Sequence, residues 1–108
     1  MNMQSVTVQE LRQKINDGED IQLIDVREPW EHDLYNIGGI LIPLGSLIEN
    51  FDKIDRNKPV IFYCQKGIRS QIAIQRLQQK FNLTNLLNLN AGIEAWQKAG
   101  LSLRGNNL

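Results

Sequence analysis

Short apolar runs separated by longer amphipathic segments make up most of the chain. The runs lie at residues 21–26, 40–42, 60–63 and 86–89. Each run has the length of a short buried strand, whereas the segments between several of them place apolar residues three or four positions apart, as a helix does. Strands that alternate with helices predict an α/β fold of three layers, in which a mostly parallel central sheet carries helices on both faces.

Capping signals place the starts of two predicted helices. In a capping box, a Ser or Thr side chain and a Glu side chain three residues later each accept a hydrogen bond from the other residue's backbone N–H. This spacing occurs in two pairs, Thr7 with Glu10 and Ser46 with Glu49. Further helices are expected at residues 30–34, 70–81 and 92–98, with Gly100 ending the last one.

The length of 108 residues is that of one ordinary domain. We therefore expect residues 1–108 to form a single domain, with a core from about residue 6 to residue 101 and a short polar, disordered tail at residues 104–108. The 12 basic and 12 acidic residues give a formal net charge of zero. Because no overall field attracts nucleic acid, we expect no nucleic-acid partner, and any attraction for an anionic substrate must be local.

The N-terminal sequence has neither the basic segment nor the apolar segment of a signal peptide, and no apolar run approaches transmembrane length. We therefore expect no membrane partner and a cytoplasmic location. One cysteine and one histidine provide neither an intramolecular disulfide nor a zinc shell, so no metal is expected. We expect the histidine, His32, at the surface rather than in the role of a general base.

The single cysteine, Cys64, stands where the predicted strand 60–63 gives way to a short loop and a helix. A helix N-terminus carries unpaired N–H groups and a partial positive charge, which favour an anion and the thiolate form of a cysteine that faces it. A cysteine at the end of a buried strand is often an inert small hydrophobic residue. Three neighbours favour a reactive thiolate instead: Gly67 allows a tight turn, Arg69 adds a cation and Ser70 adds a hydroxyl.

Three motifs resemble those of rhodanese-type sulfurtransferases and occur in the same order. The loop after the third apolar run resembles the family's active-site loop C-x-x-G-x-R-S and reads Cys64-Gln65-Lys66-Gly67-Ile68-Arg69-Ser70. The first signature of the family is similar to Asp25-Val26-Arg27-Glu28-Pro29 followed by Glu31-His32, and the last to Asn90-Ala91-Gly92-Ile93-Glu94-Ala95-Trp96 with Gly100. The resemblance runs from about residue 6 to residue 101.

The resemblance implies a sulfurtransferase that moves a sulfane sulfur from a donor such as thiosulfate, through a persulfide on Cys64, to a thiophilic acceptor such as cyanide or a thiol. Cys64 is then the nucleophile, and Arg69 orients the donor. The rest of the loop binds the substrate, chiefly with its amides: Gln65, Lys66, Gly67, Ile68 and Ser70. Asp25 and Arg27 would brace the loop by charge-assisted hydrogen bonds. No cofactor is expected, because the persulfide is covalent.

A second hypothesis is a sulfur-delivery or docking module whose ligand is a protein. The sequence Asn36-Ile37-Gly38-Gly39 is similar to that of rhodanese domains at the C-terminus of enzymes that activate sulfur-carrier proteins for molybdenum-cofactor or thiocarboxylate biosynthesis. In this hypothesis the protein partner binds an exposed patch around Trp30, Tyr35 and Ile37. Both hypotheses require Cys64, so the loop does not separate them.

A third hypothesis is a rhodanese-fold phosphatase. Such phosphatases need the spacing C-x-x-x-x-x-R, which lets the loop wrap a tetrahedral phosphate with its amides and arginine. Only four residues separate Cys64 from Arg69 in this chain. The shorter loop is expected to enclose a smaller space, suited to a single sulfur on Cys64, and it therefore favours sulfur transfer over phosphatase chemistry.

Overall fold

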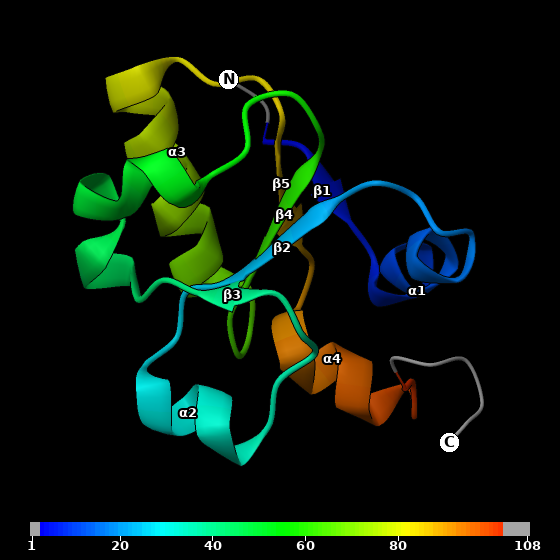
Figure 1. The fold of residues 1–108 in the computed structure, drawn as a ribbon. Helices are drawn as coiled ribbons and strands as arrows, with labels where there is room; N and C mark the ends of the chain where they lie inside the picture. The colour runs from blue at the N-terminus through cyan, green and yellow to red at the C-terminus, as the bar shows by residue number, and fades with distance from the viewer. Residues whose placement is uncertain (1–2, 103–108) are drawn as a thin grey trace.

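The computed structural model describes residues 3–102, and its centre is one parallel sheet (Figure 1). The strands lie in the order β1-β5-β4-β2-β3, and every neighbouring pair is parallel. Their bounds are β1 (Ser5–Val6), β2 (Gln22–Asp25), β3 (Ile40–Leu41), β4 (Val60–Tyr63) and β5 (Leu86–Leu89). The carboxyl ends of parallel strands share one edge of a sheet, so the loops that follow β2, β4 and β5 meet there.

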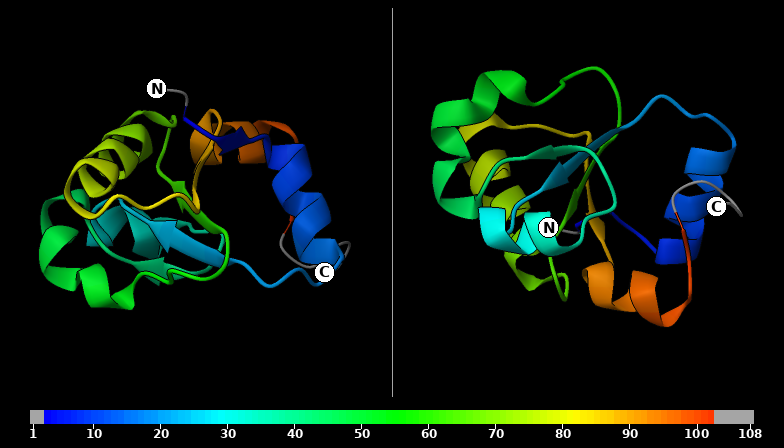
Figure 2. Two further views of the ribbon diagram at one scale, coloured as in Figure 1. Left: turned by 90° about the horizontal axis from the view of Figure 1, so that it is seen from above. Right: turned by 60° about the horizontal axis from the view of Figure 1, so that its bottom comes forward.

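Helices cover both faces of this sheet, which confirms the predicted three-layer α/β fold (Figures 1 and 2). One face carries α3 together with two short 3-10 helices, and the other carries α1 and α4. α2 lies at the carboxyl edge of the strands, below β3 in Figure 1. The bounds are α1 (Val8–Asn16), α2 (Pro29–Leu34), η1 (Leu44–Ser46), η2 (Ile48–Lys53), α3 (Ile68–Phe81) and α4 (Gly92–Lys98).

Two hydrophobic cores, one on each face, explain the unbroken apolar run of β4. Val60 and Phe62 face the core beneath α3, whereas Ile61 and Tyr63 face the core beneath α1 and α4. A strand that is buried on both faces has no polar side to show water, so its sequence is continuously hydrophobic. Cys64 follows Tyr63 and continues the alternation, which places it on the α3 side.

The two predicted capping boxes have different outcomes. Thr7 and Glu10 form theirs, with Oγ1 of Thr7 accepting at 3.0 Å and Oε1 of Glu10 at 2.8 Å. The box predicted at Ser46 is wrong, because Ser46 is the last residue of η1 and the segment consists of two 3-10 helices. The start of this segment is fixed by the sheet instead, since the Leu44 N–H donates to the Val26 carbonyl at 3.0 Å.

Smaller differences concern element ends. α3 begins at Ile68 and α2 at Pro29, earlier than expected, and the two-residue strand β1 was not predicted at all. So short a strand leaves no periodic pattern in the sequence, and only pairing with β5 reveals it. The predicted disordered tail, residues 104–108, lies outside the described residues.

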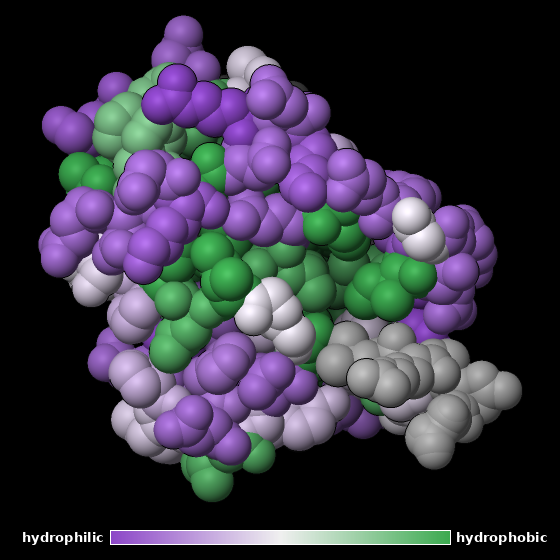
Figure 3. Space-filling view, viewed as in Figure 1, coloured by the Kyte–Doolittle hydropathy of each residue, from purple (hydrophilic) through white to green (hydrophobic). Residues whose placement is uncertain are grey.

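The surface of the view in Figure 1 is largely hydrophilic above and below, with apolar side chains gathered across its middle (Figure 3). This face includes β3, a two-residue strand at the sheet edge whose Ile40 is exposed. An edge this short offers few unpaired backbone groups for pairing with another chain. Within residues 3–102, no helix combines the length and the apolar character that crossing a membrane requires.

Candidate active site

Cys64 directly follows β4, the central strand of the sheet, and three further residues lead from it into α3. Gly67 precedes the helix with a φ of 88°, in the left-handed region that favours glycine. A Cβ at Gly67 would also lie 3.0 Å from the backbone nitrogen of Ala91. The turn that brings the loop back beneath Cys64 therefore requires a residue without a side chain.

Backbone N–H groups surround the sulfur of Cys64. Gly67 donates its N–H to Sγ at 3.1 Å, and Ser70 donates its N–H at 3.4 Å. The hydroxyl oxygen of Ser70 lies 3.4 Å from the same sulfur. Because Cys64 is only 1% exposed, the two N–H groups replace water around the sulfur, and they stabilise a negative charge there. Of the loop amides that the sequence analysis considered, those of Gly67 and Ser70 donate to the sulfur.

Asn88 supports the loop from β5, and the sequence analysis did not identify it. Its side chain is 2% exposed; Nδ2 donates to the Gly67 carbonyl at 3.4 Å, and Oδ1 accepts a hydrogen bond from the Ser70 hydroxyl. A buried amide needs such partners, because an unpaired polar group away from water is costly. The signal was present in the sequence, since Asn88 is the polar residue in the otherwise apolar run Leu86–Leu89.

The N-terminus of α4 packs directly on the loop and explains the last family-like motif. Ile93 donates its N–H to the Cys64 carbonyl at 2.9 Å, and Glu94 donates its N–H to the Gln65 carbonyl at 3.0 Å. A Cβ on Gly92 would come within 2.4 Å of the Cys64 carbonyl oxygen. The glycine of this motif is thus required by close contact between two backbones, and the contact holds Cys64 in place.

Arg69 forms a two-armed ion pair with Glu31 of α2. The two guanidinium nitrogens donate to the two carboxylate oxygens at 2.7 Å and 2.9 Å. The hydrogen bond from Arg69 lowers the pKa of Glu31 to about 2 and is the main cause of that shift. The same bond raises the pKa of Arg69 above its ordinary value. Glu31, which the sequence analysis named only as part of the first family-like motif, therefore belongs to the site.

A pocket of about 270 Å³ opens at the loop. It is lined by five of the predicted site residues: Cys64, Gln65, Lys66, Ile68 and Arg69. Gly67 and Ser70 are buried behind it, on the inner side of the loop. The pocket is below the usual range for drug-sized ligands, about 300–1,000 Å³, and its size and two cationic side chains fit a small anion.

Asp25 and Arg27 form a buried ion pair beside this loop. Two guanidinium nitrogens of Arg27 lie 3.0 Å and 2.8 Å from the carboxylate oxygens of Asp25. Both residues also bond to the segment around α2: Asp25 accepts from Nδ1 of His32 at 2.8 Å, and Arg27 donates to the Tyr35 carbonyl at 2.6 Å. Arg27 also lies over the ring of Tyr63, the residue before Cys64, at 5.8 Å from its centroid. The charge-assisted hydrogen bonds of Asp25 and Arg27 therefore hold the segment around α2 and not the loop, and the pair's contact nearest Cys64 is the one with Tyr63.

The structure alters two expectations about residues near the site. His32 is half-buried and bonded to Asp25, not a surface histidine. Ile37 is fully buried beneath α1 and α4, so it is not part of an exposed patch. Buried Tyr63 ties this segment to the core, since its hydroxyl accepts from the Ile37 N–H at 3.3 Å and donates to the Gly38 carbonyl at 2.8 Å. Trp30 and Tyr35 are exposed as expected.

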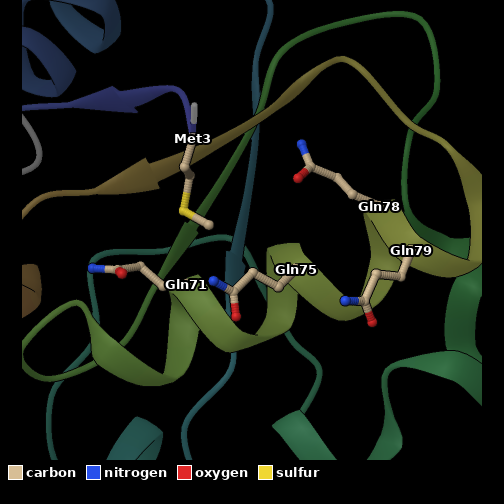
Figure 4. Close-up of a pocket in the computed structure, with 5 residues that line it drawn as sticks. All are labelled: Met3, Gln71, Gln75, Gln78 and Gln79. Carbon is tan, nitrogen blue, oxygen red and sulfur yellow. The ribbon is translucent and has the colours of Figure 1, made fainter. Parts of the chain in front are cut away.

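A second pocket, of about 450 Å³, lies along the outer face of α3 (Figure 4). Met3 points toward the helix there, and the remaining lining residues are Gln71, Gln75, Gln78 and Gln79. These side chains supply neither a nucleophile nor a charge, so we assign no chemistry to this pocket. Among residues 3–102, no three His, Cys, Asp or Glu side chains are grouped so that they could hold a metal ion.

Comparison with known proteins relates the chain to sulfurtransferases. A sulfurtransferase of Allochromatium vinosum is 34% identical over 94 residues, which cover 86% of this chain and 87% of that protein. The probable adenylyltransferase/sulfurtransferase MoeZ of Mycobacterium tuberculosis is 34% identical over 97 residues, covering 87% of this chain but 24% of MoeZ. This chain therefore spans about a quarter of the length of MoeZ.

Solved structures with a similar fold also match the chain. A crystal structure from Staphylococcus saprophyticus superposes with a TM-score of 0.80 at 33% identity, covering 93% of this chain and 99% of that one. The family model described as "Rhodanese-like domain" matches residues 7–99, a range that contains Cys64, its loop and the residues that support it. The chain belongs to the rhodanese-like family.

Proposed function

We propose that this protein is a sulfurtransferase in which Cys64 takes a sulfane sulfur from a donor such as thiosulfate and passes it to a thiophilic acceptor. The observation that carries the proposal is the sulfur of Cys64, which accepts N–H bonds from Gly67 and Ser70 beside a pocket lined by Lys66 and Arg69. Membership of the rhodanese-like family and the named sulfurtransferase relatives support it.

In the first half-reaction, the Cys64 thiolate attacks the outer sulfur of thiosulfate. A new S–S bond forms at Cys64, the S–S bond of thiosulfate breaks, and sulfite leaves with its electron pair. The negative charge then rests on the outer sulfur of the persulfide. The N–H groups of Gly67 and Ser70 donate to Sγ, so they stabilise the Cys64 thiolate that attacks the donor, and they need no reorganisation because the loop holds them in place.

In the second half-reaction, a nucleophilic acceptor attacks the outer persulfide sulfur and restores the Cys64 thiolate. Cyanide would leave as thiocyanate, and a thiol would leave as a persulfide. No second thiol within these 108 residues can be the acceptor, because Cys64 is their single cysteine. In this scheme the covalent persulfide carries the sulfur, so the reaction uses no cofactor. We place the reaction in the cytoplasm, where a lone thiol nucleophile stays reduced.

The test is intact-mass measurement of the protein before and after thiosulfate, and again after cyanide. We expect thiosulfate to add one sulfur atom and cyanide to remove it. Cys64→Ser should abolish both changes and the turnover of thiosulfate with cyanide. Persistent turnover by folded Cys64→Ser protein would exclude the covalent mechanism.

A protein acceptor is the second candidate, and a groove beside the loop favours it. The groove, of about 320 Å³, lies between α2 and α4 and is lined in part by Trp30, Leu34, Tyr35 and Gln65. Trp30 and Leu34 are exposed although they are large and hydrophobic, which is typical of a surface that binds another protein. The relative MoeZ, whose name combines adenylyltransferase and sulfurtransferase, supports sulfur transfer to a protein partner. The resemblance of Asn36-Ile37-Gly38-Gly39 would place that partner in cofactor or thiocarboxylate biosynthesis.

The two candidates differ in what Trp30 does. If the acceptor is a protein, Trp30→Ala should slow discharge of the Cys64 persulfide to that protein and leave discharge to a small thiol unchanged. If small molecules are the real acceptors, both rates should be unaffected by the substitution.

A further inference from the structure

Glu31 neutralises one of the two cations at the Cys64 pocket. It lies 38 positions before Arg69 in the sequence, yet both of its carboxylate oxygens accept from the Arg69 guanidinium. The Glu31 side chain is 13% exposed, and that of Arg69 is 36% exposed. The carboxylate is thus the more enclosed partner, and the guanidinium still lines the pocket while it is paired.

The other pocket cation, Lys66, is exposed and takes part in none of the ion pairs among residues 3–102. A donor in the pocket therefore meets one full positive charge from Lys66 and a guanidinium whose charge is already balanced. A dianion could use Arg69 fully only by competing with Glu31 for its N–H donors. The cost of that competition rises with the negative charge of the donor, because Glu31 stays nearby and repels it.

We propose that Glu31 is a specificity-determining residue, which selects against dianionic sulfur donors in favour of less charged ones by holding Arg69 in a two-armed ion pair. The inference rests on the proposed sulfurtransferase function and specifies its donor class. The alternative role has the opposite effect: a carboxylate that positions Arg69 to receive the donor would favour thiosulfate. The two roles predict opposite effects of removing the charge.

Two donors with the same reacting atom separate these roles. Cys64 thiolate attacks the outer sulfur of thiosulfate and releases sulfite, or it attacks the outer sulfur of methanethiosulfonate and releases methanesulfinate. In both reactions one S–S bond forms, one breaks, and the leaving group takes the electron pair. Thiosulfate carries two negative charges and methanethiosulfonate carries one, so their ratio of kcat/KM measures the preference for charge.

The variant to compare with the wild type is Glu31→Gln, which removes the charge but keeps an oxygen that can accept the Glu28 N–H. We expect the thiosulfate to methanethiosulfonate ratio of kcat/KM to rise about three- to tenfold. Glu49→Gln, which removes the same charge from an exposed position in η2, should leave the ratio unchanged. An unchanged or lower ratio in Glu31→Gln would overturn the proposal.

A second measurement does not depend on sulfur transfer. Cys64 is the single cysteine, so alkylation reports on it alone, and the ratio of rate constants for iodoacetate and iodoacetamide compares an anionic with a neutral reagent at the same thiolate. Glu31→Gln should raise this ratio and Arg69→Ala should lower it. A ratio that is the same in the wild type and Glu31→Gln would refute the electrostatic role of Glu31.

The two measurements also keep the inference apart from the proposed function. If the wild type accepts sulfur from neither donor, the sulfurtransferase proposal fails, and the specificity inference built on it fails with it. The alkylation ratio then still decides whether Glu31 limits the positive charge of the pocket. If sulfur transfer occurs and both ratios are insensitive to Glu31, the function stands and the inference is wrong.

Discussion

The Ser70 hydroxyl donates its proton to Oδ1 of Asn88, while its oxygen lies 3.4 Å from the sulfur of Cys64. The orientation of the Asn88 amide follows from its other bond, because the Gly67 carbonyl can only accept and Nδ2 must donate to it. A hydroxyl has one proton, so Ser70 cannot donate to Asn88 and to the sulfur at the same time. While Ser70 donates to Asn88, its oxygen can accept a hydrogen bond from a Cys64 thiol. Asn88 thereby orders the donors around the reacting atom.

Asn88→Ala should therefore destabilise the protein and disorder the loop. The substitution leaves the Gly67 carbonyl and the Ser70 hydroxyl without this buried partner, and we expect a loss of about 1–3 kcal/mol in the free energy of unfolding. Denaturant unfolding measures the loss, and alkylation of Cys64 reports on the loop. Asn90→Ala, at an exposed position two residues later, is the matched control. Equal stability of the two variants would contradict the role given to Asn88.

Gly92→Ala should disrupt the site, because the added Cβ would lie 2.4 Å from the Cys64 carbonyl oxygen and 2.6 Å from that of Gln65. These are backbone atoms, so the loop itself has to move. We expect sulfur transfer to fall at least tenfold, together with a loss of unfolding free energy beyond the roughly 1–2 kcal/mol of a left-handed alanine. Gly100→Ala has a similar φ of 67° but no atom within 4 Å, and it should show the conformational cost alone.

Ala91→Gly should stabilise the protein. Ala91 has a φ of 61°, where a Cβ is strained, and the residue is exposed, so few contacts are lost with its methyl group. Relief of the strain minus the extra chain entropy of glycine gives an expected gain of about 0.5–1 kcal/mol. Ala99→Gly, at a φ of −79°, should destabilise by a similar amount, and thermal unfolding of both variants would show the opposite signs. Destabilisation by Ala91→Gly would mean that the strain is absent.

The Glu31–Arg69 pair should make the free energy of unfolding depend on pH in the acidic range. Folding lowers the pKa of Glu31 from 4.5 to about 2, so the unfolded chain binds the proton more readily than the folded one. The stabilisation is therefore fully present above pH 4.5 and is lost as the pH falls toward 2. The difference in unfolding free energy between the wild type and Glu31→Gln should shrink over this interval. A difference that stays constant with pH would argue against the ion pair.

Lys66→Ala should slow attack on thiosulfate about severalfold, because an exposed lysine attracts a dianion through water. Salt should reduce the wild-type advantage by screening. Discharge of a preformed Cys64 persulfide to a neutral thiol should change much less, and Lys53→Ala, at an exposed position in η2, should change neither rate. Equal losses in both half-reactions would show that Lys66 shapes the loop instead of attracting the donor.

Local signals were sufficient for the elements that position the nucleophile. The apolar run of β4, the glycine after Cys64 and the helical spacing of α3 lie within about twenty residues of each other. Each depends on the backbone and on side-chain burial over a few positions, and so does the capping box of Thr7 and Glu10. These local patterns were therefore enough to predict the α/β fold and the position of Cys64 at the carboxyl end of a strand.

The partners of the site residues, in contrast, depend on contacts between segments that are distant in the sequence. Glu31 binds Arg69, which is 38 positions away in the sequence, and Asn88 binds Ser70, which is 18 positions away. The strand order places these segments side by side near the carboxyl ends of the strands. The pattern around Ile37 likewise gave no sign that this residue would be held against Tyr63 and buried. Pairings of this kind depend on how distant segments pack, whereas periodicity and caps describe only neighbours along the chain.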